Sequence, residues 1–421
     1  MKYLEKQHLV FFFCCVLMAS MIYSPFLLSV SMFALAVLCL VKFKISKTHF
    51  SLSIDLEAIL RMFRIYRYPS FVAVTLFFFI VLLSFWQTYD YDYWQTRLRI
   101  KIPFLVFPLM FLALPRFTEQ QIKGLFYCLL LMLTITGLGI MANYFLHMEE
   151  INILMKKGQP MPTPRNHIRL SLLMAIGIVA GGYLYREHFI WRYSWERKLI
   201  ATCTIFLFFC IHLLSVRTGL LALYAAIFIL IVRHIYVSRN WRHALIALAV
   251  VAITPVLAFY TLPSLRAKID YMKYDYFMYR HDRGNLYADS GRLTSLKVGW
   301  EIWRDHPVFG VGAGNLRDEV TKRFTAEHPK FAEPHMPHNQ FLFVAAGMGI
   351  VGLGLFIFAF FYPLFYHRNY RHPVLLAFYT TAFLAFMIEH SIENSIGVGF
   401  FAFFLLLFLN HLNRTPENEA T

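Results

Sequence analysis

Residues 9–41 read "LVFFFCCVLMASMIYSPFLLSVSMFALAVLCLV" and contain no charged side chain. A helix needs about 20 apolar residues to cross the hydrocarbon core of a bilayer, so this block is too long for one span. Ser24 and Pro25 interrupt it near the middle, and a helix boundary is expected before a proline. The block is therefore predicted to form a hairpin of two membrane-spanning helices.

The whole chain has the composition of a membrane protein. Of its 421 residues, 58% are hydrophobic and only 15% are charged, whereas about a quarter of the residues of a soluble domain are charged. Further apolar runs predict an all-α polytopic protein with about 12 transmembrane helices in a single membrane domain, residues 1–421. After the first hairpin, these runs lie near residues 70–87, 102–114, 122–146, 168–185, 199–216, 218–232, 243–262, 339–365, 373–389 and 395–411.

The distribution of Lys and Arg predicts the orientation of these spans. With both termini inside, the inner segments hold 20 basic residues and the short outer segments hold 8, as the positive-inside rule requires. The long segment 263–338, between predicted spans 9 and 10, then lies outside and carries 12 more basic residues. The net charge of +16 thus predicts contacts with membrane lipids and gives no reason to expect a nucleic-acid partner.

A short helix is predicted inside this outer segment, from a cap at Asp289 or Ser290 to His306. Arg292 lies in its first turn, where free backbone N–H groups favour an anion. The glycines of "GVGAGN" (310–315) are expected to be turn residues, because no βαβ unit surrounds them. The apolar residues of the helix recur three or four positions apart and would share a face on the membrane surface or on neighbouring helices: Leu293, Leu296, Trp300 and Trp303.

Several arginines are expected at the outer ends of spans. Arg217 interrupts the apolar run 199–232, where it either marks a tight hairpin by snorkelling or binds an anion. Arg165 and Arg169 are four residues apart at the start of a span and would share one face, as anchors or as anion ligands. With Arg292 these side chains could surround a diphosphate, to which each charge-assisted contact contributes about 1.5–3 kcal/mol. We expect neither a metal ion nor another cofactor.

The segment "EPHMPHNQFLF" (333–343) places histidines where polar sequence gives way to an apolar run. Ligation of a metal by Glu333, His335 and His338 is disfavoured by the two prolines and by the spacing. Imidazole is largely neutral at pH 7 and can accept a proton from a hydroxyl. His338 is therefore either an ordinary interfacial histidine or a general base at the outer membrane edge, a role that typically contributes about 10²–10⁴-fold in rate.

Two further groups of residues have alternative roles. Glu389, His390 and Glu393 at another outer helix end could bind an acceptor or merely solvate the helix ends. Tyrosines before residue 288 fit either anchoring at the membrane interface or stacking on sugar rings, and Tyr287 is our candidate for a sugar contact.

At these positions the sequence resembles the O-antigen ligase family. The resemblance rests on "RTGLL" at Arg217, on "GRLTSLKVGWEIWRDHPVFGVGAGN" with Arg292, and on "PHNQFLFVAAGMGIVGL" with His338. The last two patterns are shared with the wider superfamily, which includes O-antigen polymerases and protein O-oligosaccharyltransferases.

The resemblance implies an inner-membrane glycosyltransferase of GT-C-like architecture with a large periplasmic loop. Such an enzyme moves O-antigen glycan from undecaprenyl diphosphate to a sugar hydroxyl of lipid A-core in lipopolysaccharide biosynthesis, without metal or nucleotide. His338 would be the base, and Arg217 and Arg292 would bind the diphosphate. Further substrate contacts are expected at Arg165, Arg169, Asn339, Tyr287 and Glu389.

Two rival functions follow from the same features. An O-antigen polymerase uses the same donor but a growing glycan as acceptor, and tends to have two sizeable outer loops where this chain has one dominant loop. A transporter of lipid-linked glycan or of a small solute would need a polar pathway, and the predicted spans contain few charges to line one.

Overall fold

The computed structural model describes residues 6–45, 50–238, 241–281, 283, 288–329 and 333–414. Within these ranges, nine helices are long and apolar enough to cross a membrane, and two apolar helices are shorter. The expected helical membrane architecture is confirmed, whereas the number of about 12 spans remains a prediction.

The first apolar block forms the predicted hairpin. Helix α1 spans Lys6–Tyr23 and helix α2 spans Pro25–Leu40. The side chain of Ser24 accepts a hydrogen bond from the backbone N–H of Leu27 at 3.4 Å and so caps α2. The local rule for serine and proline at a helix start is sufficient to explain this boundary.

The chain departs from an all-α fold directly after α2. Strands β1 (Val41–Ile45) and β2 (Phe50–Ile54) pair antiparallel, with Val41 opposite Ile54. We assigned this region to an inner segment and predicted no strands there. The sequences "VKFKI" and "FSLSI" alternate apolar and polar residues, which is the period of a strand and was the available signal.

Helix α5 is longer than the predicted span 102–114. It begins at Tyr91 and ends at Ala113, and the carboxylate of Asp90 caps it by accepting the backbone N–H of Tyr93 at 2.9 Å. The charged residues in its first part hid this half of the helix from a search for apolar runs. The elements before it are α3 (Leu56–Phe63), η1 (Ile65–Arg67), α4 (Pro69–Leu83) and η2 (Ser84–Gln87).

The middle of the chain forms the expected series of apolar helices. The turn between α9 and α10 is very short: Ser215 adopts a left-handed conformation with φ 55°, and Arg217 already begins α10. The tight hairpin predicted at Arg217 is thus confirmed. The helices of this part are α6 (Glu119–Leu146), α7 (Met148–Lys156), α8 (His167–Arg186), α9 (Glu196–Leu214), α10 (Arg217–Ser238) and α11 (Trp241–Thr261).

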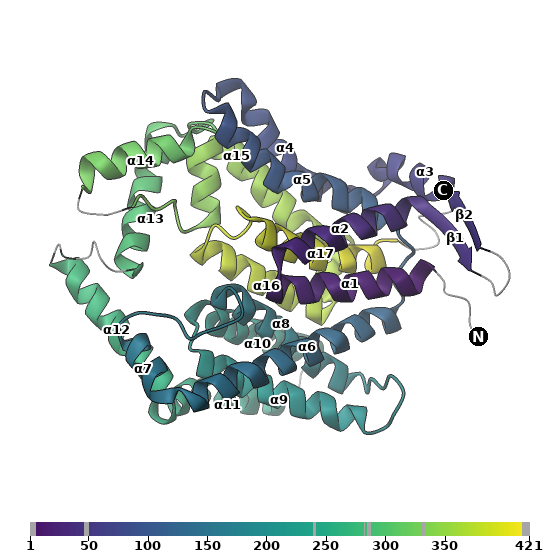
Figure 1. Ribbon diagram of the computed structural model, residues 1–421, viewed down its shortest axis with the longest axis horizontal. Coiled ribbons are helices and arrows are strands. Elements are labelled where there is room, and N and C mark those ends of the chain that lie inside the picture. Colours follow the sequence, from purple (N-terminus) through teal and green to yellow (C-terminus); the bar gives the residue numbers. More distant parts are fainter. Residues whose placement is uncertain are drawn as a thin grey trace.

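Three helices fill the segment that connects α11 to the next long apolar helix: α12 (Pro263–Arg280), α13 (Ala288–Asp305) and α14 (Leu316–Glu327). They lie at the opposite end of the molecule from β1 and β2 (Figure 1). The first turn of α13 is held by Asp275 of α12, which accepts the backbone N–H groups of Asp289 and Ser290. The carboxylate that accepts these N–H groups therefore belongs to α12 and not to Asp289 or Ser290, the two predicted capping residues.

Helix α13 does not pack through all of its predicted apolar face. Leu293 and Trp300 are 40% and 55% exposed. The buried face instead carries Val298 and Ile302, which pack with Leu316 and other residues of the outer segment. The exposed side chains of Leu293 and Trp300 fit the prediction that this face of the helix lies on a membrane surface.

Helix α15 (Gln340–Phe365) is broken at Gly349, where φ is 64° and ψ is −165°. The loop 307–312 docks on the break: the backbone N–H of Ile350 donates to the Pro307 carbonyl at 2.8 Å, and that of Gly312 donates to the Gly347 carbonyl at 2.8 Å. Gly312 and Gly310 have positive φ, which confirms them as turn residues. The outer segment is thereby fixed to a membrane helix.

The last helices complete the domain and lie near its centre (Figure 1). Helix α16 spans Pro373–Ile388 and helix α17 spans Ser395–Leu412, after the short η4 (Tyr366–Arg371). Helix α17 packs against α5, and the loop 389–394 joins α16 to it.

Candidate active site

His338 is held between helices α15 and α13. It directly precedes Asn339, whose side chain caps α15 by accepting the backbone N–H of Leu342 at 2.9 Å. The backbone N–H of His338 donates to the hydroxyl of Ser295 on α13 at 3.2 Å. The imidazole is therefore positioned by the start of α15 and by the polar face of α13.

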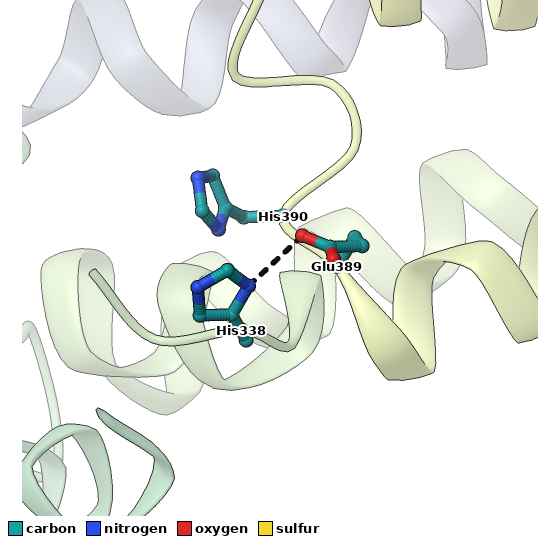
Figure 2. Close-up of side chains that lie close together, drawn as sticks. All are labelled: His338, Glu389 and His390. Carbon is teal, nitrogen blue, oxygen red and sulfur yellow. Dashed lines mark hydrogen bonds and ion pairs between the residues drawn. The ribbon is translucent and has the colours of Figure 1, made fainter. Parts of the chain in front are cut away.

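Glu389, the first residue after α16, connects His338 to an arginine. Its Oε2 lies 2.9 Å from Nδ1 of His338 (Figure 2), and its Oε1 accepts a hydrogen bond from Arg292 of α13. Burial favours the neutral carboxyl, but the His338 contact and the Arg292 charge outweigh it, so the pKa of Glu389 is below its usual value. Glu389 is thus ionised at neutral pH. One of its carboxylate oxygens contacts His338 and the other contacts Arg292.

His390 lies beside His338 and Glu389, and the three side chains form a compact group (Figure 2). Its ring centroid is 5.3 Å from that of His338, and its other side stacks on Phe343. Burial, followed by the neighbouring His338, lowers the pKa of His390, so its ring is neutral at pH 7. Its buried Nδ1 has no hydrogen-bond partner among the described residues.

Donor atoms of His338, Glu389 and His390 lie within 4.8 Å of one another, a spacing that a metal ion could use. The charge balance favours a hydrogen-bonded group instead. Glu389 is the only carboxylate of the three, and its charge is already paired with Arg292. A divalent cation bound there would meet the guanidinium at short range.

A cationic cavity of about 220 Å³ lies beside this group. Arg217, at the start of α10, lines it and forms a two-pronged ion pair with Asp289. Burial opposes ionisation of Asp289, but the Arg217 contact dominates and lowers its pKa. Arg292 and Lys268 also line the cavity, so three basic side chains from three helices converge there.

Lys268 of α12 was not identified from the sequence. Its ammonium group donates to the carbonyl of Gly158 at 3.4 Å and forms no ion pair within the described residues. Burial, followed by the charge of Arg217, lowers its pKa. Nothing in the sequence separates Lys268 from Lys273 on the same helix, because only the fold brings one of them beside the arginines.

A second cavity of about 260 Å³ adjoins the first, since Ile168 of α8 lines both. Its polar lining includes His338, Glu389 and Arg169, together with Asn166, His390, Ser391 and Asn394. Its remaining lining is largely apolar and comes from α8, α16 and α17: Leu172, Ala382, Ala385, Phe386, Phe400 and Phe401.

The other predicted site residues have varied positions. Arg165 precedes Asn166, the N-cap of α8, so it does not share a helical face with Arg169 as we expected. The amide of Asn339 donates to the Met387 carbonyl at 3.0 Å, which ties α15 to α16. Tyr287 lies outside the described residues.

Comparison with known proteins identifies one family. Residues 202–357 match a family described as O-Antigen ligase, and this range includes Arg217, Arg292 and His338. No curated protein matches the chain. The matched range is less than half of the chain, and this part of the chain is similar to the superfamily of O-antigen ligases and polymerases.

Proposed function

We propose that the chain is an O-antigen ligase. It would transfer O-antigen glycan from undecaprenyl diphosphate to a sugar hydroxyl of lipid A-core, at the periplasmic face of the bacterial inner membrane, with both termini in the cytoplasm. One observation carries the proposal: Glu389 joins His338 to Arg292 where a cationic cavity meets a partly apolar one.

His338 is the general base of this proposal. When Nδ1–H donates to Glu389, the lone pair on Nε2 is free to accept a proton. The contact also fixes the orientation of the ring, and the carboxylate stabilises the imidazolium that forms when the acceptor hydroxyl loses its proton.

The diphosphate of the donor is assigned to the cationic cavity. Arg217, Arg292 and Lys268 would contact its oxygens and stabilise the charge that grows as the glycosidic bond breaks. Asp289 and Glu389 balance two of these cations, so an anionic ligand finds a net positive site. Arg217 has Asp289 as a competing partner, and donor binding is expected to weaken that ion pair.

Glycan transfer needs no reactant other than the donor and the acceptor. The acceptor oxygen attacks the anomeric carbon of the glycan opposite the diphosphate, the C–O bond to the diphosphate breaks, and His338 takes the hydroxyl proton. Undecaprenyl diphosphate leaves with the bonding electron pair. Attack opposite the leaving group inverts the anomeric centre.

The test is transfer with purified protein, undecaprenyl-diphosphate-linked glycan and lipid A-core. We expect glycan-modified lipid A-core from the wild type and strong loss of product with Arg217→Met and Arg292→Met. Lys273→Met, which changes an exposed residue of α12, is the matched control and should remain active. Elongated lipid-linked glycan without transfer to lipid A-core would identify a polymerase and overturn the proposal.

A further inference from the structure

A buried ion pair lies behind the candidate active site. Nζ of Lys101 on α5 is 2.6 Å from Oε1 of Glu393 in the loop 389–394. The two residues are only 3% and 7% exposed. Neither contacts the two cavities that contain His338 and the basic residues.

This pair forms the centre of a hydrogen-bonded network. Oε1 of Glu393 also accepts from the amide of Gln340 at 2.8 Å, and Lys101 donates to the carbonyl of Ile392 at 2.8 Å. The carbonyl oxygen of the Gln340 side chain accepts the backbone N–H of Ile392 at 3.1 Å. Arg97, one turn before Lys101, donates to the Glu393 carbonyl at 3.1 Å.

The network holds both segments that meet in the candidate site. Gln340 is the first residue of α15 and lies two positions after His338. Glu393 lies in the same short loop as Glu389 and His390. Lys101, Glu393 and Gln340 therefore form a clamp that joins the segment of His338 to the loop of Glu389 and attaches both to α5.

Stability alone does not account for such a pair. A buried ion pair loses hydration on folding, and its replacement by apolar residues of similar volume is often neutral or stabilising. A fixed geometry for Glu389 and His390 is a benefit that an apolar pair could not supply, because apolar contacts have no direction.

We propose that Lys101 and Glu393 are positioning residues that hold Glu389 against His338. The inference rests on the proposed function, because it assumes that the His338–Glu389 contact serves glycan transfer. Donor binding through the cationic cavity does not depend on the pair, so the pair should affect kcat much more than KM for the donor.

The decisive variant is Lys101→Met combined with Glu393→Leu. It removes both charges of the pair, so neither partner is left as an unpaired buried charge. Arg97, which also lies 3.7 Å from Oε2 of Glu393, keeps its hydrogen bond to the backbone carbonyl of residue 393. We expect a thermal midpoint close to that of the wild type, an unchanged KM for the lipid-linked donor, and a fall in kcat on the order of 10–100-fold. The conservative Lys101→Arg variant, which keeps the cation, should retain most of the activity.

The control is the ion pair of Lys6 with Asp55, which is 2.9 Å long and partly shielded from solvent. It joins the start of α1 to the N-cap of α3 and has no member in the candidate site. Lys6→Met with Asp55→Leu should leave kcat unchanged. If the Lys101 and Glu393 double variant does not fold, Gln340→Met tests the same clamp while keeping the ion pair. A folded variant with wild-type kcat would overturn the inference, whereas a wild type without transfer activity would overturn the proposed function instead.

Discussion

Oε2 of Glu389 lies 2.9 Å from Nδ1 of His338, and this contact joins the end of α16 to the start of α15 across 51 residues of sequence. The second oxygen of the same carboxylate pairs with Arg292. One side chain therefore links the proposed base to the proposed diphosphate site, so its charge and its position both matter for transfer.

Replacement of His338 by Ala should reduce kcat by about 10²–10⁴-fold, because the acceptor hydroxyl then has no base. Glu389→Gln should have a smaller effect, on the order of 10-fold to 100-fold, since the amide can still orient the ring but cannot stabilise its charge. Initial rates with purified protein measure both. His335→Ala is the control; a loss of activity that equals the loss in His338→Ala would contradict the assignment.

Donor affinity should fall in alkaline solution because of Lys268. Burial and the nearby arginines lower the pKa of this amine below its ordinary value of 10.5, and only the protonated amine attracts a diphosphate. As pH rises toward this lowered pKa, the cation is lost and Kd increases. Arginine stays charged throughout this range, so Lys268→Arg should flatten the dependence.

Titration of undecaprenyl diphosphate into the purified protein between pH 7 and pH 10 would measure this effect. Lys268→Met should bind weakly at every pH, whereas Lys273→Met should follow the wild type. A wild-type Kd that is constant over the whole range would show that Lys268 does not contact the diphosphate.

Removal of metal ions should leave activity unchanged, because Arg292 already balances the charge of Glu389. Transfer assays with and without a chelator test this directly.

Excess Zn²⁺ should inhibit transfer, since it would occupy the lone pairs of His338 and His390 beside Glu389. His390→Ala should relieve that inhibition. Activity that disappears with the chelator and returns with Zn²⁺ would require a metal centre.

Gly349→Ala should destabilise the protein. A Cβ at this position would clash with the Val308 carbonyl oxygen, and φ is +64°, so both the docked loop and the backbone conformation oppose a side chain. A cost of about 1–3 kcal/mol or more is expected. Thermal unfolding in detergent would measure it.

Gly354→Ala provides the matched control on the same helix, because a Cβ there meets nothing within 4 Å. It should be neutral or slightly stabilising, since alanine favours a helix over glycine. Equal thermal midpoints for the two variants would contradict the role of Gly349 in holding the loop 307–312.

The sequence by itself determined the features that depend on neighbouring residues. Apolar length predicted most of the membrane helices, Ser24 and Pro25 located the first hairpin turn, and the short polar interruption at Arg217 located another. These features follow from hydropathy, capping and backbone restriction, which act over a few residues. The strand pair at residues 41–54 had the same kind of local signal, in its alternating pattern, and our interpretation missed it.

Only the tertiary structure decided which polar groups meet. The charged first half of α5 is tied to a distant loop, because both Arg97 and Lys101 contact Glu393. Lys268 joins Arg217 and Arg292, and Glu389 joins His338, although many residues separate them. Pairing of charges depends on distances in space and on burial, and a linear sequence specifies neither without the packing of the helices that carry them.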